Sequence, residues 1–336
     1  MKLKILAGLL FLTPFVLAAW WWVGATAQQN ALEGWLAERR GAGWQAEAAA
    51  IDVNGFPNRL DATLRAPRLA DPQSGWSWSA DRLDIRQVIY DPTFFVVEWP
   101  SEQRIAAPGA PATLRTDVME MSAKVSGEGA MSLTRASFDA VRGAVAADAG
   151  WTAGADRLTA HIRVAPDAGP ANAYEFRVDA LRLRLPDFIR RLADPADALP
   201  AALESVAAEG RAALDRPLDR FAFEGRKPQL TALTLKEARA EWGGLALEMT
   251  GAVQADDEGY AEGEIDVSAR NWKAMIEAAV AAGAIGEGFA ETLIAGLGFV
   301  ARLGGDAERL DVALTFSGGY ARLGPVPVGP APRLID

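Results

Sequence analysis

His161 is the first residue to test for chemistry, because it is the chain's one histidine and the chain has no cysteine. Disulfides, thiolate nucleophiles and cysteine-ligated zinc or iron–sulfur sites are therefore excluded. A Ser–His–acid triad would have to use His161. This residue lies in "DRLTAHIRVAP", where it alternates with Leu158 and Ile162. The alternation predicts an ordinary strand histidine.

Paired carboxylates are the second possible source of chemistry, because two acids can share general acid and base work in a hydrolase. The candidate pairs are Asp256 with Asp257, Asp81 with Asp84, and Glu262 with Glu264. The first pair falls in a predicted turn, where acids commonly support turn formation. Glu262 and Glu264 are two residues apart on a predicted strand and so share one face, which we expect to be the solvated one.

A calcium loop is the third candidate, suggested by "DVNGFPNRLD" at residues 52–61. An EF-hand loop needs glycine at its sixth position and glutamate at its twelfth. Here Gly55 stands at the fourth position and no glutamate closes the loop. We therefore predict no catalytic, cofactor-binding or metal-binding residue, and no cofactor. A carboxylate-dependent hydrolase is the least favoured function, and any ligand-binding residues stay unknown at this point.

Alternating apolar and polar residues dominate the chain after residue 45. The clearest run is "YEFRVDALRLRLP". Its apolar series is Phe176, Val178, Ala180 or Leu181, Leu183 and Leu185, set against Arg182 and Arg184. Strands with one apolar face normally form antiparallel sheets. Turn signals at 54–55, 243–244 and 256–259 predict hairpins. The glycine-rich motifs of nucleotide-binding folds are missing. We predict a mainly β (α+β) fold, an extended, curved and mostly antiparallel sheet with a few packed helices.

Helical patterns are confined to a few segments. Residues 29–40 predict a short amphipathic helix. The alanine-rich stretch at 187–215 predicts a helical connector packed on the sheet. Near the carboxyl end, Asn271 is expected to cap a helix in "WKAMIEAAVAAGAI", and a second helix follows in "GFAETLIAGLGFVARLG".

The amino terminus reads as an export signal. Lys2 and Lys4 precede a 19-residue apolar stretch at 5–23, close to the roughly 20 residues that cross a bilayer. Three tryptophans, 20–22, suit a membrane interface, and the lysines place the body outside the cytoplasm. "ATA" at 25–27 resembles a cleavage site. Cleavage and retention both stay open, with a retained anchor favoured.

The charge of the chain limits its partners. The formal net charge is −10. Nucleic-acid binding proteins present basic patches, so we expect no nucleic acid. An acidic body also argues against a polybasic grip on anionic lipid.

The proline-rich end, "LGPVPVGPAPRL" at 323–334, is the last segment to assign. Proline has no amide N–H and is tolerated at sheet edges. We predict that residues 320–328 extend the last strand as an edge and that 330–336 fray.

Several short motifs carry a family resemblance. "GAVQADDEGYAEGEIDVSARNW" (251–272) and "SGGYARLGPVPVG" (317–329) resemble the carboxy-terminal module of AsmA-like envelope proteins of Gram-negative bacteria. Together with "GFPNRLD" (55–61), "YDP" (90–92) and "WP" (99–100), they make the whole chain similar to the uncharacterised family domain of unknown function 2125 (DUF2125).

The resemblance implies a non-enzymatic, periplasmic envelope protein, anchored in the inner membrane by residues 5–23. Its expected partners are that membrane and phospholipid or acyl chains, bound along an apolar groove of the sheet. The alternative is a structural or assembly factor for envelope proteins, which would use exposed sheet edges. The expected divisions of the chain are the signal or anchor (1–27), a membrane-proximal helix (28–45), an N-terminal β half (46–190), a helical connector (191–220) and an AsmA-like C-terminal β module with a helical hairpin (221–336).

Overall fold

The computed structural model describes residues 2–108, 110–127, 129–167, 169–194, 197, 199–222, 227–281, 283, 285–303 and 306–335, and of these the side chains of 2–12, 14, 300 and 303 are left out. The chain divides into two compact units. The N-terminal unit comprises Met1–Val125 and Ala144–Gly150, and the C-terminal unit comprises Ser126–Gly143 and Trp151–Asp336.

Hairpins of the N-terminal unit alternate between two sets of paired strands. One set runs in the order β1 (Gln45–Glu47), β4 (Arg68–Asp71), β5 (Trp76–Ala80), β8 (Glu102–Ala107), β9 (Ala110–Arg115) and the end of β11 (Leu133–Ala147). The other runs in the order β2 (Ala50–Asn54), β3 (Asp61–Arg65), β6 (Arg82–Val88), β7 (Asp91–Glu98) and β10 (Val118–Val125). The hairpin expected at 54–55 is present between β2 and β3.

A buried glutamine joins the two sets of strands. The Trp78 Nε1–H donates to Gln103 Oε1 at 2.8 Å, and Gln103 Nε2 donates to Met119 Sδ at 3.2 Å. Gln103 and Trp78 belong to the first set, and Met119 is the second residue of β10, the last strand of the second set. A buried amide must be hydrogen-bonded to avoid a desolvation penalty, and these partners satisfy it.

Helix α1 (Lys2–Gly41) packs its second half on this unit. It contacts β1 and β2, the first strand of each set. Trp21 Nε1 donates to the Arg59 carbonyl at 2.7 Å, and Ala25 and Leu36 are buried. The helix expected at 29–40 is thus the end of one continuous helix. Among the described residues, the structure has no helix with the length and apolarity needed to traverse a bilayer.

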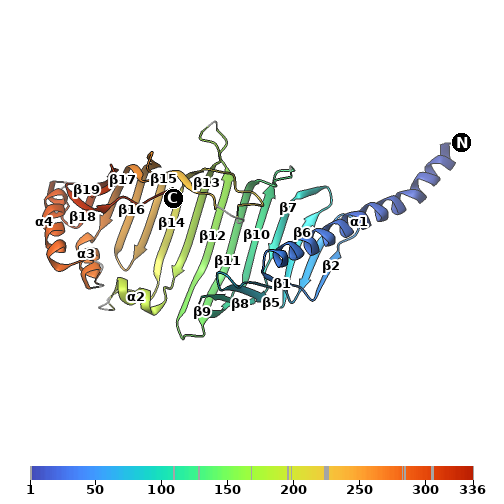
Figure 1. Ribbon diagram of the computed structural model, residues 1–336, viewed down its shortest axis with the longest axis horizontal. Helices are drawn as coiled ribbons and strands as arrows, with labels where there is room; N and C mark the ends of the chain where they lie inside the picture. Colours follow the sequence, from blue (N-terminus) through green and yellow to red (C-terminus); the bar gives the residue numbers. More distant parts are fainter. Residues whose placement is uncertain are drawn as a thin grey trace. The chain divides into compact units, whose positions relative to one another are not determined.

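The C-terminal unit is an antiparallel meander in which each strand pairs with the next (Figure 1). Its strands are β12 (Thr152–Val164), β13 (Ala173–Leu183), β14 (Leu203–Leu214), β15 (Leu230–Trp242), β16 (Leu245–Ala255), β17 (Ala261–Arg270), β18 (Arg309–Ser317), β19 (Tyr320–Leu323) and β20 (Val326–Pro330). The prediction of a mainly β, mostly antiparallel fold with a few helices is therefore confirmed.

Two of the predicted turns join the meander as expected. Gly243 and Gly244 connect β15 to β16 with φ of 55° and 87°, the positive values that a tight hairpin turn requires and that glycine adopts without strain. At the next turn Asp256 Oδ1 accepts hydrogen bonds from the backbone N–H groups of Glu258 and Tyr260. This side chain therefore serves the turn between β16 and β17.

The helical connector predicted for 191–220 is largely wrong. Among the described residues of this stretch only α2 (Asp187–Ala193) is helical, and β14 follows as a strand paired on both sides. Alanine favours helix in isolation, but two flanking strands give each β14 residue a full set of ladder partners. Gly210 allows β14 and β15 to lie this close together, because a Cβ there would lie 2.2 Å from the Thr234 carbonyl oxygen of β15.

Helices α3 (Trp272–Ala281) and α4 (Glu287–Leu303) form the predicted helical pair between β17 and β18. Trp272 and Leu297 are fully buried in a core with Leu310 and Val312 of β18. The predicted side-chain cap by Asn271 is wrong. Its Nδ2 instead donates to the Gly244 carbonyl at 2.8 Å, because its φ of 55° belongs to a turn.

The proline-rich end forms a hairpin. Residues 320–323 and 326–330 are separate strands that pair with each other, so the single extended edge strand predicted for 320–328 is wrong. The predicted fraying is also wrong for the described residues. The Ala261 N–H donates to the Pro332 carbonyl at 2.8 Å, and the Leu334 N–H donates to the Gly259 carbonyl at 2.7 Å.

Candidate functional site

One face of the C-terminal sheet is apolar, and cross-strand pairing arranges its residues in rows. Three rows matter here. They are Leu158–Ala180–Val206–Ala240–Leu247–Ala269–Leu310, Ala160–Val178–Ala208–Ala238–Met249–Val267–Val312 and Val164–Tyr174–Ala212–Leu233–Val253. Each row holds the same residue type at an early strand and at a late strand.

These matched residues differ sharply in exposure. Leu158 is 36% exposed and Leu310 is 4% exposed. Val178 is 39% exposed and Val312 is 9% exposed. Val164 is 47% exposed and Val253 is 9% exposed. The apolar face is therefore closed at Val253, Leu310 and Val312 and open at Leu158, Val164 and Val178, although Tyr174 and Ala180 of β13 are buried in the same rows. We call Leu158, Val164 and Val178 the open apolar surface.

The closed end has identifiable covers. Leu293, Leu297 and Ala301 of α4 are buried against Leu310 and Val312. The chain end also contributes, since Leu334 packs against the cluster of Val253, Ala261 and Ile265. The covering of the later strands thus comes from α4 and from the end of the chain.

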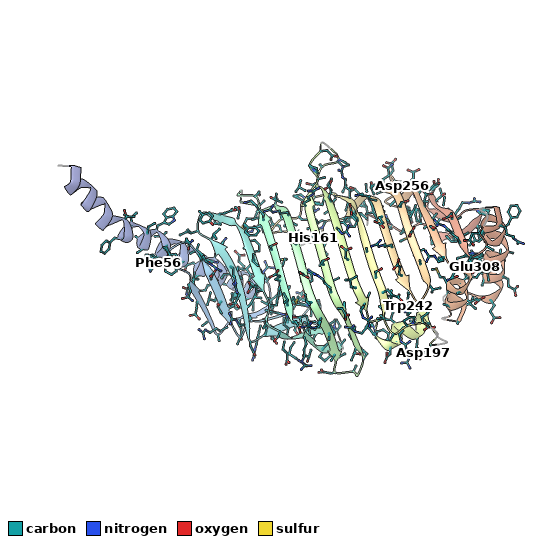
Figure 2. The ribbon with its side chains drawn as sticks, turned by 180° about the vertical axis from the view of Figure 1, so that it is seen from behind. Phe56, His161, Asp197, Trp242, Asp256 and Glu308 are labelled. Carbon is teal, nitrogen blue, oxygen red and sulfur yellow. The ribbon has the colours of Figure 1, made fainter. Side chains whose placement is uncertain are left out.

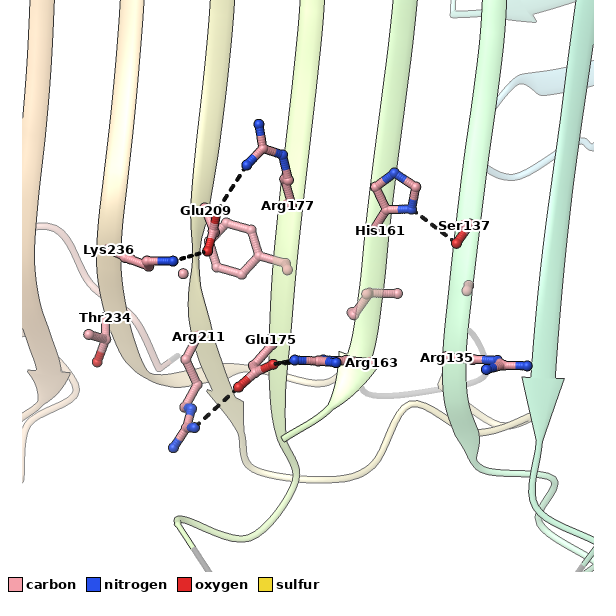
Figure 3. Close-up of a pocket in the computed structure, with 14 residues that line it drawn as sticks. Arg135, Ser137, His161, Arg163, Glu175, Arg177, Glu209, Arg211, Thr234 and Lys236 are labelled. Atoms are coloured by element: carbon pink, nitrogen blue, oxygen red, sulfur yellow. Dashed lines mark hydrogen bonds and ion pairs between the residues drawn. The ribbon is translucent and has the colours of Figure 1, made fainter. Parts of the chain in front are cut away.

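The opposite face of the same strands is polar and has a depression of about 750 Å³ at its centre (Figure 3). Its polar lining residues are Arg135, Ser137, His161, Arg163, Glu175, Arg177, Glu209, Arg211, Thr234 and Lys236. The other four, Ala136, Ile162, Phe176 and Gly210, alternate with them along the strands. All of these residues belong to the C-terminal unit.

Two carboxylates organise this depression, and each is shared by two cations. Glu175 pairs with Arg163 at 2.6 Å and with Arg211 at 3.5 Å. Glu209 pairs with Arg177 at 3.0 Å and with Lys236 at 2.6 Å. From outside the lining, Asp167 pairs with Arg211 and Asp179 pairs with Arg177. Figure 3 shows the two clusters side by side on β12–β15.

A β-bulge supplies the lysine. The register between β14 and β15 shifts between Glu209 and Gly210, which oppose Glu237 and Leu235. Lys236 is the extra residue, and a bulge re-aims such a residue. Its hydrogen bond is the main cause that lowers the pKa of the Glu209 carboxyl, and the same bond raises the pKa of Lys236. Both groups are therefore held in their charged forms.

His161 makes one notable contact, with Ser137. Its Nδ1 lies 3.0 Å from Ser137 Oγ. Both residues lie within strands, as the sequence predicted for the histidine, which Figure 2 labels on the sheet. An oxyanion hole needs unengaged backbone N–H groups, and β12 and β13 commit theirs to the sheet ladder. The pair has the contact of a dyad, and the paired backbone groups of β12 and β13 beside it serve the sheet.

The remaining acidic candidates have local roles. Asp52 pairs with Arg65 at 2.6 Å, and Asp84 accepts a hydrogen bond from Thr63 Oγ1 at 2.6 Å. Glu264 Oε2 accepts from Thr315 Oγ1 at 3.2 Å on the polar face, as expected for its wet side. Within the described part of the chain, no group of three or more histidine, aspartate or glutamate residues could hold a metal ion.

Fold and surfaces together define the class: a protein built on antiparallel sheet, with one apolar sheet face only partly covered. The chain belongs to the family described as uncharacterized protein conserved in bacteria (DUF2125), whose model matches residues 21–332. The predicted family is thereby confirmed. Comparison with curated proteins and comparison with solved structures each give no match.

Proposed function

We propose that this is a non-enzymatic envelope protein of Gram-negative bacteria that binds an acyl chain or phospholipid on the open apolar surface. One observation carries the proposal: matched residues of the same rows are buried at β16–β18 and exposed at β12–β13. The AsmA-like resemblance of the carboxy-terminal motifs agrees with it. In this proposal the apolar face of β12–β14 is the lipid-binding groove that the sequence leads us to expect.

The energetics favour an apolar ligand. Burial of apolar surface contributes about 25 cal/mol for each Å² removed from water. A contiguous exposed apolar patch on a protein usually marks a binding surface. An alkyl chain lying across Leu158, Val164 and Val178 would bury carbon surface without leaving a polar group unpaired. The strands beneath use their backbone polar groups within the sheet.

The amino-terminal helix supports an association with the inner membrane, with the body in the periplasm. Six large apolar side chains of α1 are 44–65% exposed: Phe15, Val16, Leu17, Trp20, Trp22 and Val23. Successive helical residues are roughly 100° apart, so these six cover roughly 220° of the helix circumference. A protein partner would contact one side of a helix, whereas lipid surrounds it. We propose residues 5–23 as the anchor.

The assembly-factor alternative draws less support from the sheet edges. Strands β1 and β2 are contacted by α1. Strand β20 carries Pro327 and Pro330, which lack the N–H that strand addition would use. Natural edge strands use such features to prevent further pairing.

Photo-crosslinking in cells tests the proposal on the full chain. Cells expressing the protein are fed a photoactivatable fatty acid and irradiated, and labelled peptides are mapped by mass spectrometry. We expect label on peptides that contain Leu158, Val164 or Val178. Label confined to peptides of α1 would mean that lipid meets the anchor alone, and would refute binding at the sheet.

A further inference from the structure

The lining of the depression on the polar face has more basic than acidic residues, unlike the chain as a whole. Acidic residues outnumber lysine and arginine overall, 44 to 34. Among the residues that line the depression, five are arginine or lysine and two are glutamate. Nothing in the proposed lipid-binding function uses this face, because it lies on the other side of the same strands.

Two of the four paired cations, Arg163 and Lys236, stand outward, and the carboxylates lie beneath them. The side chains of Arg163 and Lys236 are 67% and 74% exposed, whereas those of Glu175 and Glu209 are 29% and 31% exposed. A ligand entering the depression would therefore meet ammonium and guanidinium groups first. A lysine has three N–H donors and an arginine has five. Each of these two cations shares its carboxylate with a second cation, so it has donors left for a ligand.

The ion pair between Lys236 and Glu209 depends on the bulge in β15. A regular strand would place Lys236 and Glu237 on opposite faces. The bulge lets Lys236 pair with Glu209, which also pairs with Arg177. Counted with Asp167 and Asp179, which pair with Arg211 and Arg177 from outside the lining, each cluster holds two cations and two carboxylates. Arg163 and Lys236 each pair with one carboxylate in these clusters.

We propose that the depression binds phosphate-bearing ligands through Arg163 and Lys236. Guanidinium groups match phosphate oxygens with two parallel hydrogen bonds, and an ammonium adds a point charge. A volume of about 750 Å³ holds a small phosphorylated molecule or a lipid headgroup. Phosphate chemistry is common to both sources.

Titration calorimetry on the full-length protein tests this inference with glycerol 3-phosphate as the soluble probe. Vesicles of phosphatidylcholine with or without phosphatidic acid form the second arm. We compare wild type with Arg163→Gln and Lys236→Gln. The control is Arg157→Gln, because Arg157 is also an exposed arginine of β12, pairs with Asp139 at 2.7 Å and does not line the depression.

We expect each depression variant to bind at least about tenfold more weakly than wild type, and the control to bind like wild type. Binding should also weaken as salt screens the charges. Binding of the soluble probe supports a soluble phosphate ligand, and binding of phosphatidic acid vesicles alone supports a headgroup. Equal binding by all variants, or no binding in either arm, would overturn the inference. Lipid crosslinking at the open apolar surface is a separate readout, so either proposal can fail without the other.

Discussion

Val178 and Val312 stand in one cross-strand row of the C-terminal sheet, yet Val178 is 39% exposed and Val312 is 9% exposed. Both are valines on the same face, so neither residue type nor strand alternation accounts for the difference. The cover does: α4 and Trp272 lie over β18. The protein therefore contains both a closed and an open form of the same apolar sheet face.

The closed end should depend on α4. Leu297 is fully buried in the cluster with Leu310 and Val312. Replacing it by alanine leaves a cavity, so we expect Leu297→Ala to lower the free energy of unfolding by about 2–5 kcal/mol in urea titrations. Phe299→Ala on the same helix removes a 63% exposed ring and should change it by less than about 0.5 kcal/mol. Equal effects of the two variants would contradict the packing described here.

Gly210 should be intolerant of a side chain. A Cβ there would lie 2.2 Å from the Thr234 carbonyl oxygen and 3.2 Å from the Phe176 ring. The backbone must shift to admit it, so Gly210→Ala should destabilise the protein by about 1–3 kcal/mol in thermal or urea unfolding. Gly288 in α4 has open space around its Cβ position. Gly288→Ala should leave stability unchanged or raise it by up to about 1 kcal/mol.

Lys236 should control the titration of Glu209. The hydrogen bond from Lys236, followed by its charge and then Arg177, lowers the pKa of Glu209 below the ordinary 4.5. As pH falls, the Glu209 carboxyl takes up its proton at a higher pH in the unfolded chain than in the folded protein. The stabilising contribution is therefore complete above about pH 4.5 and is lost as pH falls through the folded pKa. Carboxyl NMR should show the Glu209 midpoint rising in Lys236→Met, and an unchanged midpoint would refute the pairing.

The amino-terminal helix should remain on the mature protein. The proposed anchor predicts that the protein stays in the membrane fraction after an alkaline carbonate wash. It also predicts that mass spectrometry of the purified protein finds residues 5–23 still attached to the body. A mature terminus at Gln28 would show cleavage after Ala27 and remove the anchor from the proposal.

Local patterns predicted much of this fold, because strands and turns depend on near neighbours. The turn residues Gly243, Gly244 and Asp256 predict their hairpins. The periodicity after Asn271 predicts the helical pair. Strand β14 was missed because its alanines favour helix, and only its two partner strands override that preference. The sequence predicts a fraying tail, because the residues that hold the tail in place, Gly259 and Ala261, are distant from it in sequence.

The candidate surfaces were harder to predict. The alternation around Val178 predicts an apolar face but cannot say whether another element covers it. That depends on α4 and Leu334, which lie more than a hundred residues later in the chain. The cluster of Glu209 with Lys236 depends on a bulge, and a bulge changes which residues share a face. Lysine next to glutamate in "LKEAR" is the one sequence signal that could have indicated it.

Capture of a lipid by paired lysine variants tests the central proposal most directly. Val178 and Leu181 both lie on β13, are 39% and 49% exposed, and lie on opposite faces, because Val178 pairs with Ala160 and Leu181 pairs with Arg157. Full-length Val178→Lys and Leu181→Lys are compared with wild type for crosslinking to the photoactivatable fatty acid at peptides of β12 and β13. We predict that Val178→Lys loses most of the label and that Leu181→Lys keeps it. Equal labelling of the two variants would contradict lipid binding at the open apolar surface.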